Sequence, residues 1–342
     1  MSCFLFFLLS STCLAEEIPL RTIGVVAPLT GLSTGSGQTI KNSIDLAVEE
    51  SSNPKVKFLF EDDQFEPKNT VTAVRKLIEI DHVDGLIVWG TPTSLAVNGI
   101  AEKAKIPLLA FSLLDKVVED KKFVMKHWLP SSAISAGVTS EVIKRHIKTV
   151  SLVVQLNDAM LKLKDDFLKA DVTKVLSSAE YPRTESDFRS EVTKIKSLNP
   201  DAVYLLLWAP QPSLFAKQLR AAGYKGQIFG MQNLEDQNEI AAANSALENA
   251  WLLGTDDSKA GSFTKSYKDK FNSDPVAGGC NAYDVARIFI GCGSSADLNL
   301  CLHSVKDFHG VLGTYSATER NDFSLTPLLK CIHDGKITAD GC

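Results

Sequence analysis

The chain has 342 residues, which is long enough for two domains or for one large domain with a substantial core. Hydrophobic residues make up 44% of the sequence and charged residues 23%, an ordinary globular composition. The net charge of -5 and the lack of a basic cluster argue against nucleic acid or an anionic membrane as a partner. The six histidines are scattered and give no metal-binding motif.

The first 15 residues form a compact apolar run that ends in small residues, MSCFLFFLLSSTCLA. This pattern predicts a secretory signal peptide at residues 1–15, cleaved after Ala15, and the run is too short to span a bilayer as a mature helix. No Lys or Arg precedes the run, so either translation starts farther upstream or the segment is not a signal. A lipid-modified Cys13 is the alternative, but Ser11 and Thr12 make a poor lipobox.

Five cysteines remain without this leader, and all lie in the last quarter of the chain. In an exported protein such clustering predicts disulfides, and because five is odd, at least one cysteine is free or pairs elsewhere. The preferred pairs are Cys292 with Cys301, which flank a Gly-Ser loop, and Cys331 with Cys342, which flank a Gly-containing tail. Other connectivities stay open. No pair has the C-x-x-C spacing of a zinc or redox motif.

The rest of the chain is organised around residues 21–50. An apolar run at 23–27 predicts a strand, Pro28 breaks it, and small residues form a loop over 30–37. The next apolar residues recur at helical spacing and predict a helix: Ile40, Ile44, Ala47 and Val48. Gly and Ser in the loop let the backbone approach a ligand at the carboxyl end of the strand, where open α/β sheets bind ligands. The alternative is an ordinary connection in a doubly wound domain.

Strand and helix patterns then alternate. Further strands are expected at 56–60, 85–89, 106–111, 149–154, 175–178, 201–207, 227–230 and 250–254. Helices are expected at 70–80, 135–146, 158–170 and 187–198, and two more follow loops at 90–94 and 208–212 and end at Ala104 and Ala222. This βαβ rhythm predicts parallel, doubly wound α/β sheets. Two successive sets without a change in composition predict two similar lobes.

Several short motifs stand in a fixed order along residues 21–337. They are IGVVAPLTG at 23–31, EDD at 61–63 followed by EP at 66–67, SDF at 186–188, NPDAVY at 199–204, QLRAAG at 218–223, NAYDVA at 281–286 and DFHGVLG at 307–313. Their order and spacing resemble the type I periplasmic binding proteins. Within that family the chain is most similar to the leucine/isoleucine/valine-binding group of ABC transporter receptors.

The resemblance implies two doubly wound, Rossmann-like α/β lobes joined by a three-crossing hinge, with a ligand between them. Lobe one would hold residues 17–128 and 254–325, and lobe two residues 129–253 and 326–342. The hinges would lie near 128–129, 253–254 and 325–326. It also implies a periplasmic, monomeric protein without a cofactor, whose ligand-closed form is read by an ABC permease.

The resemblance further implies that ligand contacts come from loops at the carboxyl ends of strands. The matching positions are Ser36, Gln38, Trp89, Thr91, Thr93, Ala110, Phe111, Ser112, Asn157, Asp158, Trp208, Gln232 and Asp236. Thr91 and Ser112 stand where the family binds a ligand carboxylate with hydroxyls and backbone amides. The alternative is that these hydroxyls cap the following helix.

The chain departs from the amino-acid binders at the head-group positions. Leu114 replaces a hydroxyl residue, the neutral Gln232 falls at or near the acidic partner of a ligand ammonium, and residues 157–159 lack the covering aromatic ring. A buried ammonium without a carboxylate is costly to desolvate, so Glu235 or Asp236 would have to substitute. Four aromatic residues expected near the cleft suggest a flatter or more apolar acid or amide, although core packing is the alternative for each: Trp89, Phe111, Trp128 and Trp208.

An enzyme is not expected. The loop at 31–37 is neither G-x-G-x-x-G nor a P-loop, and no G-x-S-x-G occurs. The acidic run at 61–63 suggests a metal only weakly, because no second ligand cluster with suitable spacing accompanies it. Two functions remain: a transport receptor for a small carboxylate-type, aromatic or aliphatic solute, and the ligand-binding component of a sensory system that uses the same fold. A family member that has lost its ligand is a third possibility.

Overall fold

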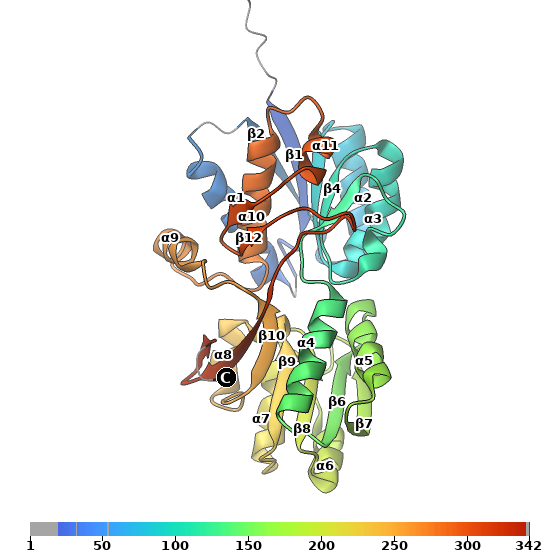
Figure 1. The fold of residues 1–342 in the computed structure, drawn as a ribbon, viewed down its shortest axis with the longest axis vertical. Helices are drawn as coiled ribbons and strands as arrows, with labels where there is room; N and C mark the ends of the chain where they lie inside the picture. Colours follow the sequence, from blue (N-terminus) through green and yellow to red (C-terminus); the bar gives the residue numbers. More distant parts are fainter. Residues whose placement is uncertain (1–19, 32, 53–54, 340–341) are drawn as a thin grey trace, which may run out of the picture.

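The computed structural model describes residues 20–31, 33–52, 55–339 and 342, so the signal peptide expected at 1–15 lies outside the described residues. Two α/β lobes stand one above the other (Figure 1). Lobe one, the upper body in Figure 1, is built on a five-stranded sheet, and lobe two, the lower body, on a seven-stranded sheet. The expected α/β architecture with two doubly wound lobes is confirmed.

The sheet of lobe one is parallel and has the order β2-β1-β3-β4-β5. Its strands are β1 (Arg21–Ala27), β2 (Val56–Asp62), β3 (Gly85–Trp89), β4 (Leu108–Phe111) and β5 (Val124–Lys126). The helices around it are α1 (Thr34–Glu49), α2 (Pro67–Glu79), α3 (Thr91–Ala104), α9 (Gly261–Phe271), α10 (Gly279–Cys292) and α11 (Leu298–His303), with a 3-10 turn, η1 (Asp115–Val117). A small hairpin, β11 (Phe308–Gly310) and β12 (Gly313–Tyr315), completes the lobe.

Helices cover both faces of this sheet because successive strand residues point to opposite sides. Ile23, Val25 and Ile87 pack with α1 and α10 on one face. Val26 and Val88 pack with α2 and α3 on the other. The central strands are therefore continuous apolar runs, and all five residues of β3 are buried.

The sheet of lobe two has the order β14-β13-β10-β9-β8-β6-β7. Five of its strands are parallel: β6 (Thr149–Gln155), β7 (Lys174–Tyr181), β8 (Ala202–Leu206), β9 (Gln227–Met231) and β10 (Trp251–Thr255). The antiparallel strands β13 (Pro327–His333) and β14 (Lys336–Thr338) extend it. Its helices are α4 (Ser131–Lys144), α5 (Asp158–Ala170), α6 (Arg189–Leu198), α7 (Gln211–Ala221) and α8 (Gln237–Ala243), with a 3-10 turn, η2 (Gln232–Leu234). Helices α4 and α5 pack on one face and α6, α7 and α8 on the other.

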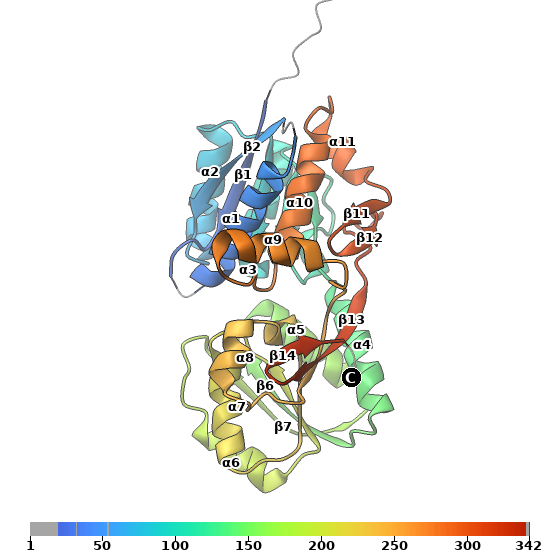
Figure 2. The same ribbon diagram turned by 90° about the vertical axis from the view of Figure 1, so that its left-hand side faces the viewer.

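The chain passes between the two lobes three times (Figures 1 and 2). It leaves lobe one after β5, returns after β10 to form α9 and α10, and leaves again after β12 to form β13. Each sheet is thus assembled from segments that are distant in sequence, and both present the carboxyl ends of their parallel strands to the space between the lobes.

Several element boundaries differ from the sequence predictions. Helix α1 begins at Thr34, inside the expected loop at 30–37, and Gly37 in its first turn packs so closely on Pro28 that a Cβ would lie 2.0 Å from the Pro28 carbonyl oxygen. Helix α3 begins at Thr91, inside the expected loop at 90–94, with Pro92 in its first turn, a favoured position for proline. Strand β7 runs three residues past Ser178 because it is a half-exposed edge strand without a continuous apolar run.

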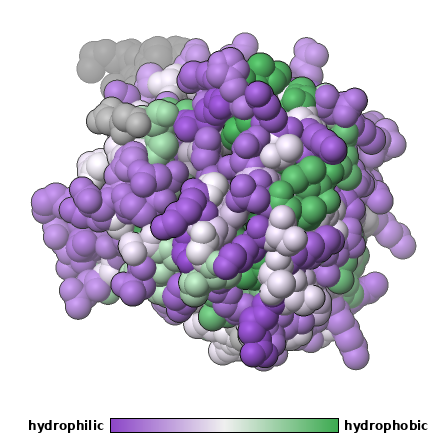
Figure 3. All heavy atoms as spheres, turned by 90° about the horizontal axis from the view of Figure 1, so that it is seen from below, coloured by the Kyte–Doolittle hydropathy of each residue, from purple (hydrophilic) through white to green (hydrophobic). Residues whose placement is uncertain are grey.

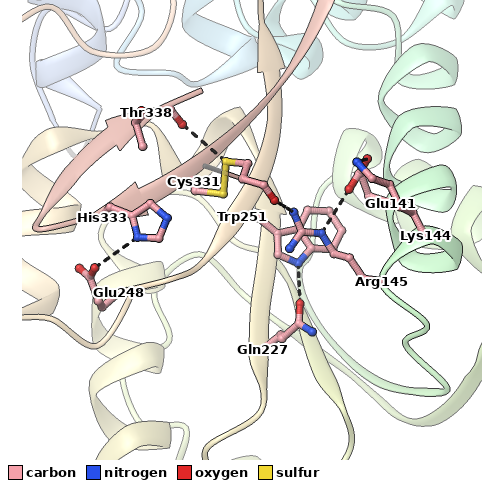
Figure 4. Close-up of a disulfide and its surroundings, with 10 residues drawn as sticks. Glu141, Lys144, Arg145, Gln227, Glu248, Trp251, Cys331, His333 and Thr338 are labelled. Carbon is pink, nitrogen blue, oxygen red and sulfur yellow. Dashed lines mark hydrogen bonds and ion pairs between the residues drawn. A yellow bond between two sulfur atoms is a disulfide. The ribbon is translucent and has the colours of Figure 1, made fainter. Parts of the chain in front are cut away.

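The structure contains the two preferred disulfides, Cys292–Cys301 in lobe one and Cys331–Cys342 in lobe two, and Cys280 is free. The second disulfide joins the C-terminal residue to β13 (Figure 4). Arg145 of α4 donates to the carbonyl oxygen of Cys342 at 2.8 Å, and its guanidinium lies over the Trp251 ring, 5.0 Å from the centroid. Cys342 is therefore held to lobe two by the disulfide and by a hydrogen bond from Arg145, whose guanidinium also makes a cation–π contact with Trp251.

Hydrophilic residues cover most of the lower end of lobe two, with hydrophobic residues gathered in limited patches (Figure 3). Among the described residues, no helix is both long enough and apolar enough to span a membrane.

Candidate functional site

A cavity of about 440 Å³ lies between the lobes, at the carboxyl ends of strands from both sheets. This is the position at which open α/β sheets bind ligands. Its walls are mixed, with apolar rings beside hydroxyls, amides and charged groups. The lining residues are Ser33, Gly35, Ser36, Phe65, Glu66, Trp89, Gly90, Thr91, Pro92, Phe111, Leu113 and Trp128 from lobe one, and Gln155, Leu156, Asn157, Asp158, Ala159, Arg183, Trp208, Ala209 and Asp236 from lobe two.

The wall of lobe one contains a cluster of three aromatic rings: Trp89 and Phe111 end β3 and β4, and Trp128 follows β5. The Trp89 and Trp128 centroids are 5.3 Å apart with the rings edge to face, and Phe111 lies 6.0 Å from Trp89. Gly278 supports the cluster from behind, because a Cβ there would lie 2.7 Å from Trp89. The three rings are buried and also line the cavity, so each of them serves both core packing and the cavity wall. The Nε1 of Trp128 is buried and has no hydrogen-bond partner among the described residues.

The first turn of α3 borders this wall. Gly90 precedes the helix with a φ of 95°, a conformation that favours glycine, and no side chain caps the helix. The 3-10 turn η1, which follows Ser112, has no side-chain cap either, so neither Thr91 nor Ser112 caps the helix that follows it. Instead, the two hydroxyls contact each other at 3.1 Å, and they accept hydrogen bonds from the amides of residues 113 and 114. Thr91 borders the cavity, and Ser112 lies behind it.

The wall of lobe two is more polar and more exposed. Asn157 caps α5 by accepting from the amide of Met160 at 3.0 Å, and its amide donates to Gln155. Gln155 in turn donates to Gln211 at 2.7 Å, so these amides form a fixed network. Trp208 is half-buried and supplies the large ring of this wall.

Arg183 is the one cationic side chain among the lining residues. It follows β7, is half-buried, and reaches across to lobe one, where it donates a hydrogen bond to Ser33 Oγ. Its guanidinium lies over the Phe65 ring, 5.2 Å from the centroid. Desolvation by burial lowers the pKa of Arg183, and the charge of Glu66 opposes that shift.

Gln232, which stands at or near the position of the acidic head-group partner, and its suggested substitutes Glu235 and Asp236 have different roles in the structure. Gln232 is buried and donates to Thr255 at 2.7 Å, away from the cavity lining. Glu235 is paired with the buried Lys330 at 3.0 Å, and Lys330 also binds Asp257 at 2.7 Å. Burial raises the pKa of Glu235. Of the two proposed substitutes, only Asp236 reaches the cavity.

The structure places eight of the expected contact residues in the cavity lining: Ser36, Trp89, Thr91, Phe111, Asn157, Asp158, Trp208 and Asp236. It places five elsewhere: Gln38, Thr93, Ala110, Ser112 and Gln232. Gln38 is exposed and donates to Asn42 one turn along α1. The Thr93 hydroxyl donates to the carbonyl oxygens of residues 89 and 90, and Ala110 is buried in β4.

Two residues of the lining, Phe65 and Arg183, were not among the contacts expected from the sequence. Phe65 follows the acidic run 61–63, whose side chains hold the loop in place. Asp62 accepts from the amide of Gln64 at 3.0 Å, and Asp63 accepts from that of Phe65 at 2.9 Å. The acidic run is therefore structural, and the described residues contain no cluster suited to a metal ion.

A family model described as periplasmic binding protein matches residues 21–297. The Leu/Ile/Val-binding protein homolog 3 of Brucella melitensis is 26% identical over 333 residues, covering 89% of this chain and 88% of its own length. The crystal structure of leucine-binding protein LivK from Thermotoga maritima is similar at a TM-score of 0.86 and 22% identity, covering 93% and 97% of the two chains. A solute-binding protein from Rhodopseudomonas palustris in complex with benzoate has a TM-score of 0.85 at 20% identity, covering 94% and 95%.

Proposed function

The chain belongs to the periplasmic binding protein family, and from that premise we propose that it is the solute receptor of an ABC importer for a small carboxylic acid with an apolar or aromatic body. Members of this family are solute-binding transport proteins and not enzymes. The observation that carries the proposal is the cavity between the lobes, in which one wall is aromatic and the other holds a cationic side chain.

The size and chemistry of the cavity support a small organic acid. A volume of about 440 Å³ falls in the range of small-molecule sites. Three packed rings and Trp208 provide apolar surface for the body of the ligand. The solved relatives include a leucine-binding protein and one that holds benzoate, and both of those ligands carry a carboxylate.

Binding would act through closure of the two lobes. We infer that lobe one comprises residues 17–128 and 254–325, that lobe two comprises 129–253 and 326–342, and that the hinges lie near 128–129, 253–254 and 325–326. A ligand that contacts both lobes favours the closed state by its differential affinity, and a permease can then recognise that state. Export to the periplasm by the leader at 1–15 and a permease partner are part of the same proposal.

A thermal-shift screen of residues 16–342 tests the function. The panel should contain leucine, 4-methylpentanoate, its amide, benzoate, benzamide and a set of sugars and polyamines. We expect an acid to raise the melting temperature in proportion to the logarithm of its concentration, as mass action requires. Isothermal titration of each hit then gives its affinity. A protein that is stabilised by none of these solutes would contradict the proposal.

A further inference from the structure

We propose that Arg183 binds the carboxylate of the ligand and thereby ties lobe two to lobe one, an inference that rests on the proposed function. The guanidinium has five N–H donors and uses one of them, in the bond to Ser33. It forms no ion pair within the part of the chain that the structure describes. The charge of Glu66 offsets the desolvation of this half-buried cation only in part, because the pKa of Arg183 is still lowered, and a ligand carboxylate in direct contact would offset it further.

The orientation of Arg183 is fixed by a platform on lobe one. Its guanidinium lies over Phe65, and the Phe65 ring packs directly on Gly90, where a Cβ would lie 2.3 Å from it. Gly90 immediately precedes the first turn of α3. The cation therefore lies on the same side of the cavity as a 14-residue helix whose N-terminus also favours negative charge.

The platform itself is held in a strained backbone conformation. Gln64 and Phe65 have φ angles of 55° and 63°, and a bulky residue in the left-handed region is a genuine outlier. The Asp62 and Asp63 carboxylates fix it by accepting the amides of these two residues. Strain that the surrounding structure maintains in this way is typical of ligand clamps.

The other charges of the cavity indicate a monoanion. Glu66, Asp158 and Asp236 also line it, and none of them forms a direct ion pair with Arg183, although the charge of Glu66 acts on it. One guanidinium and a helix N-terminus can neutralise one carboxylate, whereas a second would face three acidic side chains. The ligand class is therefore a monocarboxylate whose apolar body lies against the aromatic wall.

A competing explanation is that Arg183 only fastens the lobes together, through Ser33 and Phe65. The two roles differ in their effect on matched acids and amides. If Arg183 binds the carboxylate, Arg183→Gln should weaken binding of an acid and leave its primary amide nearly unaffected. If Arg183 only fastens the lobes, Arg183→Gln and Ser33→Ala should weaken acid and amide by the same factor.

The experiment is isothermal titration of benzoate, benzamide, 4-methylpentanoate and 4-methylpentanamide into wild type, Arg183→Gln, Arg183→Lys and Ser33→Ala. Arg189→Gln is the matched control, because Arg189 is exposed, is paired with Asp187 and lies outside the cavity lining. For Arg183→Gln we expect a loss of at least about tenfold in acid affinity and less than about twofold in amide affinity, since hydrogen bonds to charged groups are the stronger ones. Arg183→Lys should retain part of the acid affinity, and Arg189→Gln all of it.

Three results would overturn the assignment: unchanged acid affinity in Arg183→Gln, equal losses for acid and amide, or a wild-type protein that binds only neutral or cationic solutes. In the last case solute binding by the protein stands, but the acid as ligand class and the role of Arg183 both fall. A wild-type protein that binds no solute at all instead removes the proposed function. Thermal melting of each variant without ligand separates loss of binding from loss of folding.

Discussion

The two walls of the cavity are built differently. The lobe-one wall consists of Trp89, Phe111 and Trp128, which are buried and pack on one another. The lobe-two wall presents half-buried or exposed groups, Trp208, Arg183 and Asp158, beside the buried Gln155 and Ala159. The aromatic rings of the lobe-one wall are already packed against one another without a ligand. The second wall, that of lobe two, exposes groups that would gain most if a ligand brought the lobes together, so we expect affinity and closure to depend mainly on it.

The same contrast extends to the groups behind each wall. Behind Trp128, the buried His127 contacts the Tyr315 hydroxyl at 2.9 Å, and that hydroxyl donates to Asp284 at 2.9 Å. Asn281 donates to the carbonyl oxygen of His127 at 3.0 Å. This network joins β5, α10 and β12 in one rigid unit. We expect variants of lobe one to change stability more than affinity, and variants of the lobe-two wall to do the reverse.

The largest effect is expected for Gly278→Ala. Gly278 has a φ of 97°, and an added Cβ would lie 2.7 Å from Trp89. Backbone strain and overpacking together should cost about 2–4 kcal/mol of unfolding free energy. Urea denaturation followed by tryptophan fluorescence measures this loss, and the aromatic wall should be displaced enough to weaken binding as well.

Gly313→Ala is the matched control for that variant. Gly313 has a φ of 90°, and no atom lies within 4 Å of its added Cβ, so only the strain remains. It should cost about 1 kcal/mol and leave binding unchanged. Equal losses of unfolding free energy in the two variants would show that the contact between residue 278 and Trp89 is unimportant. The aromatic wall of lobe one would then not be packed in advance of ligand binding.

The disulfides provide one comparison for each lobe. Cys292–Cys301 and Cys331–Cys342 close loops with sequence separations of 9 and 11, so each should contribute about 2–3 kcal/mol in the chain-entropy account. The double Ser variants of either pair should lose stability by that amount and keep ligand affinity within about twofold. Peptide mapping by mass spectrometry without reductant should recover both bridges and a free Cys280. A different pairing, or a selective loss of binding, would contradict this view.

His127 should make lobe one sensitive to acid. Burial lowers the pKa of His127 to about 3, so the unfolded chain binds a proton below pH 6.5 and the folded chain does not. The contribution of His127 is therefore fully present above pH 6.5 and is lost as the pH falls towards 3. At pH 5 the loss should reach about 2 kcal/mol.

The variant His127→Gln isolates this contribution. It should be less stable than wild type at pH 8, and its stability should fall less between pH 6.5 and 4.5. Burial raises the pKa of Asp284, which acts in the opposite direction, so the difference between the two proteins is the informative quantity. Parallel stability curves over this range would show that His127 is not kept neutral by the fold.

The sequence predicted parts of both walls: four of the eight contacts expected from lobe one and four of the five expected from lobe two line the cavity. Apolar runs such as 85–89 identify buried parallel strands, and a residue that follows such a run must lie at the carboxyl edge of the sheet. The strand predictions place Trp89 and Phe111 at that edge, and the family resemblance identified the edge as the place of ligand contact. The loop after β7 was not found, because that edge strand is half-exposed and its apolar run ends early. Arg183 thus fell outside the set of expected contacts.

Other differences come from interactions that a local pattern does not contain. The orientation of the Phe65 ring depends on the left-handed backbone conformation of residues 64 and 65, which the carboxylates of Asp62 and Asp63 hold in place. Whether Glu235 or Asp236 reaches the cavity depends on Lys330, which is 95 residues away in sequence from Glu235. Residues 255–342 gave family motifs but few element predictions, and the structure shows that their strands complete both lobes.

The smallest effect on stability, and a clear effect on affinity, is expected for Trp208→Ala. Trp208 is half-buried on the lobe-two wall, so truncation removes ring surface that a bound ligand would cover without opening the core of the lobe. Affinity should fall about tenfold, or about 1.4 kcal/mol, while the unfolding free energy changes by less than about 1 kcal/mol. Leu156→Ala is the matched control, because Leu156 lines the same wall but is 49% exposed. It should change affinity by less than about twofold. If Trp208→Ala unfolds the protein or binds the acid as tightly as wild type, the second wall is not the one that controls affinity, and the contrast between the two lobes fails.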